Sequence, residues 1–176
     1  VGFKNGTDGK LNVAINALES ATHPHRFMGI NPQGQVALLQ TQGNPDGHII
    51  LRGGKQPNYD SVCVSDCEAE LADSDLLASL VVDCSHANSN KDYRRQPLVA
   101  DNVFNQICEG NKSIIGIMLE SHLNAGNQSA DLPQEELAYG VSVTDACIDF
   151  ATTQELVALA QDKLAQTLVE RIRSAD

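Results

Sequence analysis

The chain has 176 residues, of which 41% are hydrophobic and 20% charged, and its formal net charge is −11 at pH 7. This length suits one ordinary domain with a hydrophobic core. The acidity argues against a surface for nucleic acid or for an anionic membrane, because phosphate groups require a basic face. It does not exclude a local basic pocket for a small anion. No apolar stretch approaches the roughly 20 residues that a membrane-spanning helix needs, so we expect no membrane partner.

The chain opens with a predicted strand and helix. The apolar run Val1–Phe3 ends in Lys4, and the residues Asn5–Gly9 that follow are typical of a turn. Apolar residues then recur at helical spacing from Leu11 to Ala21. A strand that ends in a lysine and returns through a helix is the first unit of a repeating pattern.

A hairpin is predicted next. The short runs Arg26–Ile30 and Gln35–Gln40 are separated by Asn-Pro-Gln-Gly, which is typical of a tight reversal between two strands. A hairpin is antiparallel, so it cannot belong to the wall of a parallel barrel. We therefore expect it to be an insertion over about residues 26–40.

Three further apolar runs each end in a residue that can bind an anion or a metal. These runs and the residues that follow them are His48–Leu51 with Arg52, Ser79–Ser85 with His86, and Ile114–Leu119 with Glu120. The spacing matches a strand–loop–helix unit, and such residues at the ends of successive parallel strands are how a (β/α)₈ barrel builds its active site. A whole barrel takes roughly 250 residues. We expect an α/β fold in which residues 1–176 form the C-terminal half of a (β/α)₈ barrel, with about four βα units, cut from a larger protein.

Helices are predicted between and after these strands, joined at residues 121–141 by a long polar connection. The last helix is expected to begin with a capping box formed by Thr152 and Glu155. The residues expected to face the core are Val62, Cys63, Cys67 and Leu71 in one helix, Leu98, Val103, Phe104 and Ile107 in the next, and Val157, Ala160, Leu164, Leu168 and Ile172 in the last.

The five cysteines indicate a reducing compartment. Their number is odd, and the pair Cys63 and Cys67 has no second pair with which to complete a zinc site. We therefore expect reduced thiols in a cytoplasmic protein. Cys84 lies two residues before His86 on the same strand face, so it is either a metal ligand or, as we favour, a core residue.

His86, Glu120 and Asp145 are the candidate metal ligands. One imidazole and two carboxylates suit Mn²⁺, Fe²⁺, Co²⁺ or Zn²⁺ better than Ca²⁺ or Mg²⁺. Each residue also has an ordinary alternative. A histidine after a strand is often only hydrogen-bonded in its loop, an acidic loop residue is usually solvated, and Asp145 can cap the turn that follows it.

Lys4 and Arg52 are the candidate anion-binding residues. Arginine offers a rigid fork for phosphate or carboxylate, whereas lysine is a mobile point charge. Gly53 and Gly54 allow a close approach of the backbone. The alternative for Arg52 is a structural ion pair at the mouth of the barrel.

With these residues in place, the chain resembles the C-terminal half of the class I DAHP (3-deoxy-D-arabino-heptulosonate 7-phosphate) synthases. The segments that match this family are VGFKNGTDG, GNPDGHIILRGGKQPNY, VDCSHANSNKDYRRQP, SIIGIMLESHLNAGNQ and YGVSVTDACIDF. The segment HRFMGINPQGQVALLQTQGNPDG is most similar to the tyrosine-sensitive isoenzyme. The resemblance extends over essentially the whole chain.

The resemblance implies the first step of the shikimate pathway, in which phosphoenolpyruvate and erythrose 4-phosphate condense at a divalent metal to give DAHP and phosphate. It implies metal binding by His86, Glu120 and Asp145. It also implies substrate binding by Lys4, Arg52, His86 and Asp145, with Lys4 and His86 catalytic. The hairpin would line the pocket for a feedback amino acid, most simply tyrosine, near Phe27 and Gly29.

The family's fourth metal ligand, a cysteine, and further phosphate-binding residues would belong to the N-terminal half. Because the loss of one oriented group typically costs orders of magnitude in rate, we expect the chain alone to be inactive. Its two open strand edges predict a homo-oligomer. Two alternatives remain: a non-catalytic module for amino-acid binding or oligomerisation, and another barrel lyase that acts on a phosphorylated keto acid.

Overall fold

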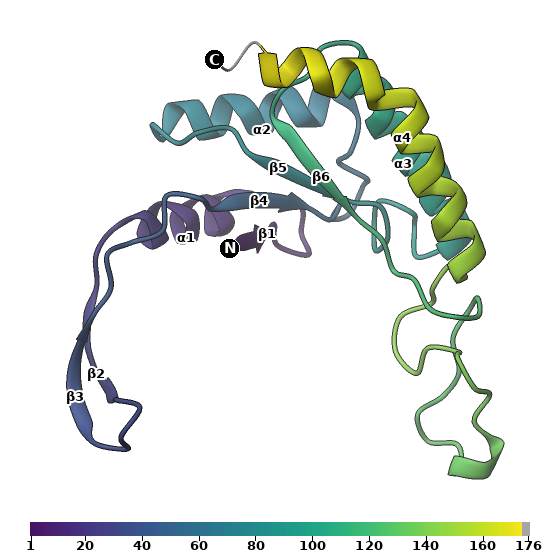
Figure 1. Ribbon diagram of the computed structural model, residues 1–176, viewed down its shortest axis with the longest axis horizontal. Helices are drawn as coiled ribbons and strands as arrows, with labels where there is room; N and C mark the ends of the chain where they lie inside the picture. The colour runs from purple at the N-terminus through teal and green to yellow at the C-terminus, as the bar shows by residue number, and fades with distance from the viewer. Residues whose placement is uncertain (174–176) are drawn as a thin grey trace.

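A four-stranded parallel sheet is the centre of the computed structural model, which describes the backbone of residues 1–173 and the side chains of residues 1–171 (Figure 1). Its strands, in spatial order, are β1 (Gly2–Lys4), β4 (His48–Leu51), β5 (Leu80–Asp83) and β6 (Ile114–Met118). All three neighbouring pairs are parallel. The four strand–helix units predicted from the sequence are therefore present.

Four helices follow the four strands along the chain. They are α1 (Asn12–Thr22), α2 (Ser61–Asp73), α3 (Gln96–Cys108) and α4 (Phe150–Arg173), with short 3₁₀ turns η1 (Tyr93–Arg95) and η2 (Gln134–Glu136). Apart from Lys4, His48 and Asp83 at their ends, the strands consist of apolar residues and glycine, as is typical of parallel strands that helices cover. Ile49, Leu80 and Ile114 are completely buried and pack in one core with residues from all four helices.

The antiparallel hairpin expected over residues 26–40 is present as β2 (Arg26–Ile30) and β3 (Val36–Gln40), which pair from Arg26 with Gln40 to Ile30 with Val36. Figure 1 shows that the hairpin extends away from the sheet. The Asn31 side chain accepts hydrogen bonds from the backbone N–H groups of Gln33 and Gln35, at 3.0 and 2.9 Å, and so fixes the turn.

The predicted buried faces of two helices need correction. Val62 and Leu98, expected in the core, are exposed, whereas Val64 and Val99 are buried in their place. In each helix the buried residues recur at spacings of three and four, and the exposed residue lies on the opposite face. Apolar character alone did not distinguish the two faces.

The start of α4 also differs from the prediction. Thr152 lies inside the helix, and Asp149 caps it by accepting a hydrogen bond from the Thr152 backbone N–H at 2.8 Å. This bond, with the Thr152 hydroxyl, lowers the pKa of the Asp149 carboxyl. The predicted capping box of Thr152 and Glu155 is therefore wrong.

The apolar stripe of α4 is only partly covered. Leu156 and Leu164 are buried, but Val157 and Leu168 are 60% and 41% exposed. The side chain of Ile172, which was also expected in this stripe, lies outside the described residues. Part of this apolar stripe is therefore left exposed to solvent.

The connection between β6 and α4 has more structure than its polar sequence indicated. Isolated bridges join Ser121 to Ile148, Gly126 to Cys147 and Asn127 to Ser142. Both ends of the connection therefore meet beside the sheet, and Figure 1 shows the segment between them projecting from the end of β6. Over residues 1–173, no helix combines the length and apolarity that crossing a membrane requires.

Candidate functional site

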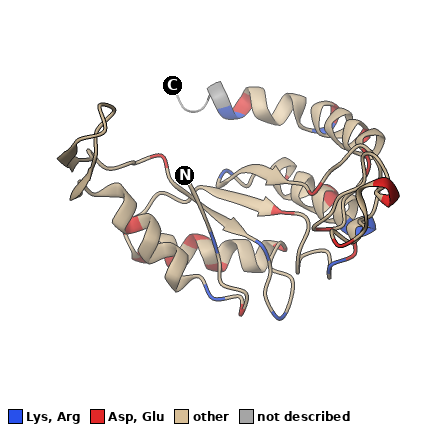
Figure 2. Ribbon diagram, turned by 90° about the horizontal axis from the view of Figure 1, so that it is seen from below, with Lys and Arg blue, Asp and Glu red and all other residues tan. Residues whose placement is uncertain are grey.

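The residues singled out from the sequence lie at one edge of the sheet. Lys4 is the last residue of β1, and Arg52 directly follows β4. His86 and Glu120 follow β5 and β6 within three residues. Because the strands are parallel, their carboxyl ends meet at the same edge, and Figure 2 shows charged segments where the strand arrows end.

His86, Glu120 and Asp145 converge. Nε2 of His86 lies 3.5 Å from Oδ2 of Asp145 and 4.0 Å from Oε1 of Glu120. One ligand atom from each residue can be chosen so that all lie within 4.8 Å of one another. The His86 side chain is 18% exposed, that of Glu120 30% and that of Asp145 61%, so the cluster opens to solvent on the side of Asp145.

A polar depression of about 310 Å³ adjoins this cluster. Among the residues that line it are His86, Lys91, Asn127 and Asp145. It places His86 and Asp145 at a surface that a small polar molecule can reach.

Asp83 is the charged residue of this site that sequence reasoning missed. It ends β5 and is completely buried. Its Oδ2 accepts a hydrogen bond from Lys4 Nζ at 2.9 Å and lies 2.8 Å from His86 Nδ1. Its Oδ1 accepts the backbone N–H of Ser85 at 2.9 Å. The available signal was an aspartate inside an otherwise apolar strand, since a buried carboxylate requires partners.

His86 adopts a left-handed backbone conformation with φ of 49°. Such a conformation is uncommon for a residue other than glycine and persists where the surrounding structure holds it. Here the His86 carbonyl accepts hydrogen bonds from the Lys91 N–H at 2.7 Å and from the Ser89 hydroxyl at 3.2 Å. The turn after β5 is thereby fixed with the imidazole directed at the cluster.

Three asparagines join the ends of β1, β4 and β5. Oδ1 of Asn5 accepts hydrogen bonds from the Arg52 N–H at 2.8 Å and from the Asn58 side chain at 3.2 Å. Oδ1 of Asn88 accepts the Asn58 N–H, and its Nδ2 donates to the carbonyls of Leu51 and Asp83. Since Asn5 and Asn88 are buried, this network makes the strand ends a single rigid unit.

Gln96 positions Glu120. The buried side chain of Gln96, at the start of α3, accepts the Glu120 backbone N–H at 2.8 Å and donates to the Glu120 carbonyl at 3.0 Å. The amide side chain of Gln96 thus bonds both the N–H and the C=O of Glu120, as the backbone of a neighbouring strand would. It fixes the backbone at the point where the Glu120 carboxylate leaves the sheet.

Arg52 is held by its backbone and not by an ion pair. Within residues 1–171, no carboxylate lies within 4.0 Å of its guanidinium, so the alternative of a structural ion pair finds no partner there. Packing within the chain accounts for the glycine after Arg52. A Cβ at Gly53, where φ is 73°, would come within 2.8 Å of the Ala87 Cβ.

The other sequence candidates lie outside the cluster. Cys84 is completely buried in the hydrophobic core, where burial raises the pKa of its thiol to about 12, and its sulfur is not among the clustered donor atoms. Phe27 and Gly29 lie on the hairpin, which extends away from the sheet (Figure 1). A Cβ at Gly29 would come within 2.5 Å of Leu39 Cδ1, so this glycine makes room for the opposite strand.

Comparison with known proteins identifies the family. A sequence model of the DAHP synthetase I family matches residues 1–158. The chain belongs to this family. It is 60% identical over 172 residues to the protein named "Phospho-2-dehydro-3-deoxyheptonate aldolase, Tyr-sensitive" of Escherichia coli (strain K12), a match that covers 98% of this chain and 48% of that protein. The family assignment made from the sequence motifs is confirmed.

Two further DAHP synthetase I relatives place the chain within the family. The Phe-sensitive aldolase of Escherichia coli (strain K12) is 49% identical over 157 residues, covering 89% of this chain and 45% of that protein. The solved structure of the phospho-2-dehydro-3-deoxyheptonate aldolase from Francisella tularensis SCHU S4 has a TM-score of 0.86 and 41% identity, covering 93% of this chain and 48% of that one. The chain spans about half the length of these relatives.

The asparagine network predicts a specific loss of stability. Replacing Asn88 by Ala leaves the Asn58 N–H and the carbonyls of Leu51 and Asp83 without their partner. Each unsatisfied buried group costs about 1–3 kcal/mol, so Asn88→Ala is expected to lower the unfolding free energy by at least that amount in urea titrations. The exposed helical Asn16→Ala is the control, with an expected change of no more than about 0.7 kcal/mol. An equal, small effect of both changes would contradict the role of the network.

Proposed function

We propose that this chain supplies the C-terminal half of a (β/α)₈ barrel and, with it, part of the active site of a DAHP synthase, a transferase that condenses phosphoenolpyruvate with erythrose 4-phosphate. The observation that supports the proposal most directly is the convergence of one imidazole and two carboxylates within 4.8 Å at the carboxyl ends of the strands. Family membership and the names of the relatives agree with it. The residues of the proposed site are contributed by four different strand ends and one loop, as in barrel enzymes.

His86 Nε2, Glu120 and Asp145 are the proposed ligands of a divalent metal. The donor set fits such an ion, because one nitrogen and two carboxylate groups suit Mn²⁺, Fe²⁺, Co²⁺ or Zn²⁺. Glu120 and Asp145 have no lysine or arginine partner among the ion pairs of residues 1–171, so their charges remain available. When bound, the metal supplies Lewis-acid polarisation of a carbonyl oxygen.

Lys4 and Arg52 are the proposed binding groups for phosphoenolpyruvate. Both are cations at adjacent strand ends, and β1 and β4 are direct neighbours in the sheet. Arg52 can hold a carboxylate or phosphate with two parallel hydrogen bonds, while Lys4 adds a point charge. Together with His86 they would orient the anion beside the carboxylates, and Asp145 at the open side would contact the second substrate.

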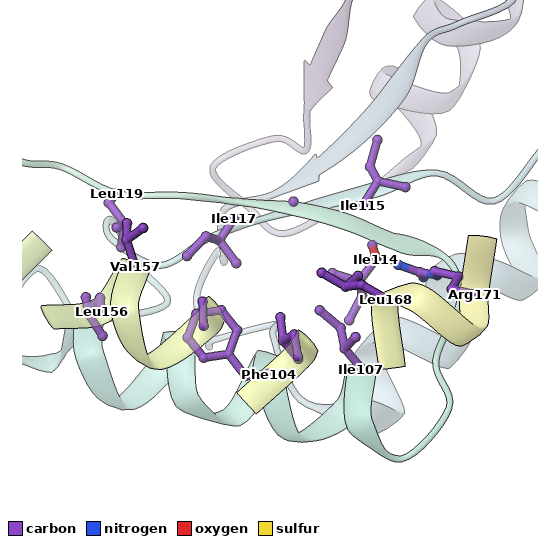
Figure 3. A pocket seen from close by; sticks show the side chains of 13 residues that line it. Phe104, Ile107, Ile114, Ile115, Ile117, Leu119, Leu156, Val157, Leu168 and Arg171 are labelled. Atoms are coloured by element: carbon purple, nitrogen blue, oxygen red, sulfur yellow. Dashed lines mark hydrogen bonds between the residues drawn. The ribbon is translucent and has the colours of Figure 1, made fainter. Parts of the chain in front are cut away.

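The open flank of the sheet is the proposed surface for the other half of the barrel. Within the described residues, β1 and β6 each pair with one strand only. Beside β6 an apolar groove of about 250 Å³ lies against α3 and α4, and Figure 3 shows Ile117 and Phe104 directed into it. A further βα unit from the N-terminal half would pair with β6 and cover Val157 and Leu168. The chain alone would cover this flank with a second copy.

The hairpin is the proposed regulatory element. Relatives are named Tyr-sensitive and Phe-sensitive, which indicates feedback by an aromatic amino acid in this family. We place the effector, most simply tyrosine, near Phe27 and Gly29 on the projecting β2–β3 hairpin.

All five cysteines are free thiols, which agrees with a cytoplasmic location.

Two alternatives make different predictions. A non-catalytic module for amino-acid binding or oligomerisation would use the hairpin but not the cluster, so it would bind tyrosine without binding metal. Another barrel lyase would keep the cluster but accept a different phosphorylated keto acid. The preserved convergence of His86, Glu120 and Asp145 favours an enzyme site over the module.

Metal binding tests the cluster directly. The chain is expected to bind Co²⁺ in calorimetric titrations, and His86→Ala and Glu120→Gln are each expected to weaken binding more than about tenfold, because each removes a proposed ligand. The exposed His25, which directly precedes the hairpin, offers the matched control, and His25→Ala should bind as the unmodified chain does. Tyrosine binding without Co²⁺ binding would support the non-catalytic module instead.

We propose that catalysis also requires groups from the other half of the barrel, so the purified chain is expected to form no DAHP from phosphoenolpyruvate and erythrose 4-phosphate with Mn²⁺. Activity should appear when the unmatched N-terminal segment of the Escherichia coli Tyr-sensitive relative is added in trans. The same mixture prepared with His86→Ala is the control and should remain inactive. DAHP formation by the chain alone would refute the proposed division of the active site.

The open flank predicts self-association. Light scattering is expected to show dimers or larger species for the chain alone, and the double change Val157→Glu and Leu168→Glu should shift them towards the monomer because it places charge in the groove. Leu77→Glu, at a residue 83% exposed outside the groove, is the control. A monodisperse monomer of the unmodified chain would contradict this expectation.

A further inference from the structure

The strongest unexplained feature of the site is the position of Asp83. Its carboxylate is completely buried, yet it is not used in the proposed binding of metal or substrate. A buried carboxylate is costly unless charged or hydrogen-bonding groups surround it. Asp83 has three such neighbours, and two of them are Lys4, a proposed anion-binding residue, and His86, a proposed metal ligand.

The two carboxylate oxygens of Asp83 have distinct partners. Oδ1 accepts the Ser85 backbone N–H at 2.9 Å, which anchors the carboxylate to its own strand end. Oδ2 faces Lys4 Nζ at 2.9 Å and His86 Nδ1 at 2.8 Å. One oxygen therefore contacts both the proposed anion-binding group and the proposed metal ligand.

The buried Nδ1 atom of His86 points to the same conclusion. It is close to Asp83 but has no aligned hydrogen-bond partner within the described part of the chain. The Asp83 oxygen, 2.8 Å away, is the acceptor within reach of a proton on this atom. With the proton on Nδ1, the lone pair of the neutral ring lies on Nε2, which faces Glu120 and Asp145.

We propose that Asp83 is a positioning residue that, through one carboxylate oxygen, sets the tautomer of His86 and the place of Lys4. This inference rests on the proposed function, because it assigns His86 and Lys4 their roles in metal and anion binding. A partner on the second ring nitrogen commonly orients a ligating histidine and fixes which nitrogen is free. The arrangement also gives the two binding groups a common anchor, since both contact the same oxygen of one buried carboxylate.

The variant Asp83→Asn separates this role from simple packing, because it preserves the size of the side chain. Its remaining carbonyl oxygen would stay on the Ser85 N–H, which leaves the amide NH₂ facing Lys4 and His86. Nδ1 of His86 would then accept a hydrogen bond, and the proton would move to Nε2. The altered tautomer removes the lone pair that faces the cluster.

The tautomer is measured without metal. In two-bond ¹H–¹⁵N NMR spectra of the metal-free chain at alkaline pH, His86 is expected to be protonated on Nδ1, and in Asp83→Asn on Nε2. The loss of the corresponding signals in His86→Gln assigns them. Nε2 protonation in the unmodified chain would overturn the inference, whether or not any variant folds. If the single variant does not fold, Asp83→Asn combined with Lys4→Met relieves the contact of the new amide with the ammonium group.

Metal affinity provides the second readout. Asp83→Asn is expected to lower the affinity for Co²⁺ by about 10- to 100-fold. Asp101→Asn is the matched control. Asp101 forms a 2.6 Å ion pair with Lys163 that is not part of the cluster, so this change should leave Co²⁺ binding unchanged. Unaltered Co²⁺ affinity in Asp83→Asn would overturn the inference. Failure of the unmodified chain to bind Co²⁺ would instead count against the proposed metal site, while the tautomer still decides the role of Asp83.

Discussion

A carboxylate inside a protein must be matched by donors, and at the end of β5 this requirement organises the surrounding groups. Asp83 draws the ammonium of Lys4, the backbone N–H of Ser85 and the ring of His86 to one point. Lys4 comes from a strand that is not even adjacent to β5, since β4 lies between them. The cost of burying one charge is thus offset by contacts that bring distant strand ends into a common geometry.

Neutral amide side chains hold the other carboxyl ends of the strands in place. Asn5, Asn58 and Asn88 connect three strand ends, while Gln96 connects α3 to the end of β6. Amide side chains suit this role because each offers both donors and an acceptor without introducing a charge that needs its own partner. The charged groups that remain are therefore free to face the opening, where a ligand can meet them.

Local sequence patterns predicted the strands and the residues at their ends well, because an apolar run and the residue after it are adjacent in the chain. The convergence of His86 with Glu120 followed from the parallel topology alone. Local sequence patterns were less informative about which helix face is buried and where a helix begins, because tertiary packing determines both. Val62 and Leu98 are as apolar as their buried neighbours, and only the position of the sheet decides which face is covered. Thr152 resembled a cap, but the chain direction at Asp149 determines where α4 begins.

The missed residues share one property, which is that their partners are far away in sequence. Asp83 and Lys4 are 79 residues apart, and Gln96 and Glu120 are 24 apart. The sequence can mark Asp83 as a charge in an apolar strand, but the partners of Asp83 and Gln96 become visible only when the fold brings them into contact.

The bridge between Ser121 and Ile148 has a consequence for how the cluster opens. The Ile148 N–H donates to the carbonyl of Glu120, and the His122 N–H donates to the carbonyl of Ile148. These backbone hydrogen bonds therefore join Glu120 to the segment that contains Asp145. Because Gln96 also holds the Glu120 backbone, loosening of this bridge would release the loop that contains Asp145 while Glu120 and His86 stay in place, so the opening of the cluster would depend on that loop alone.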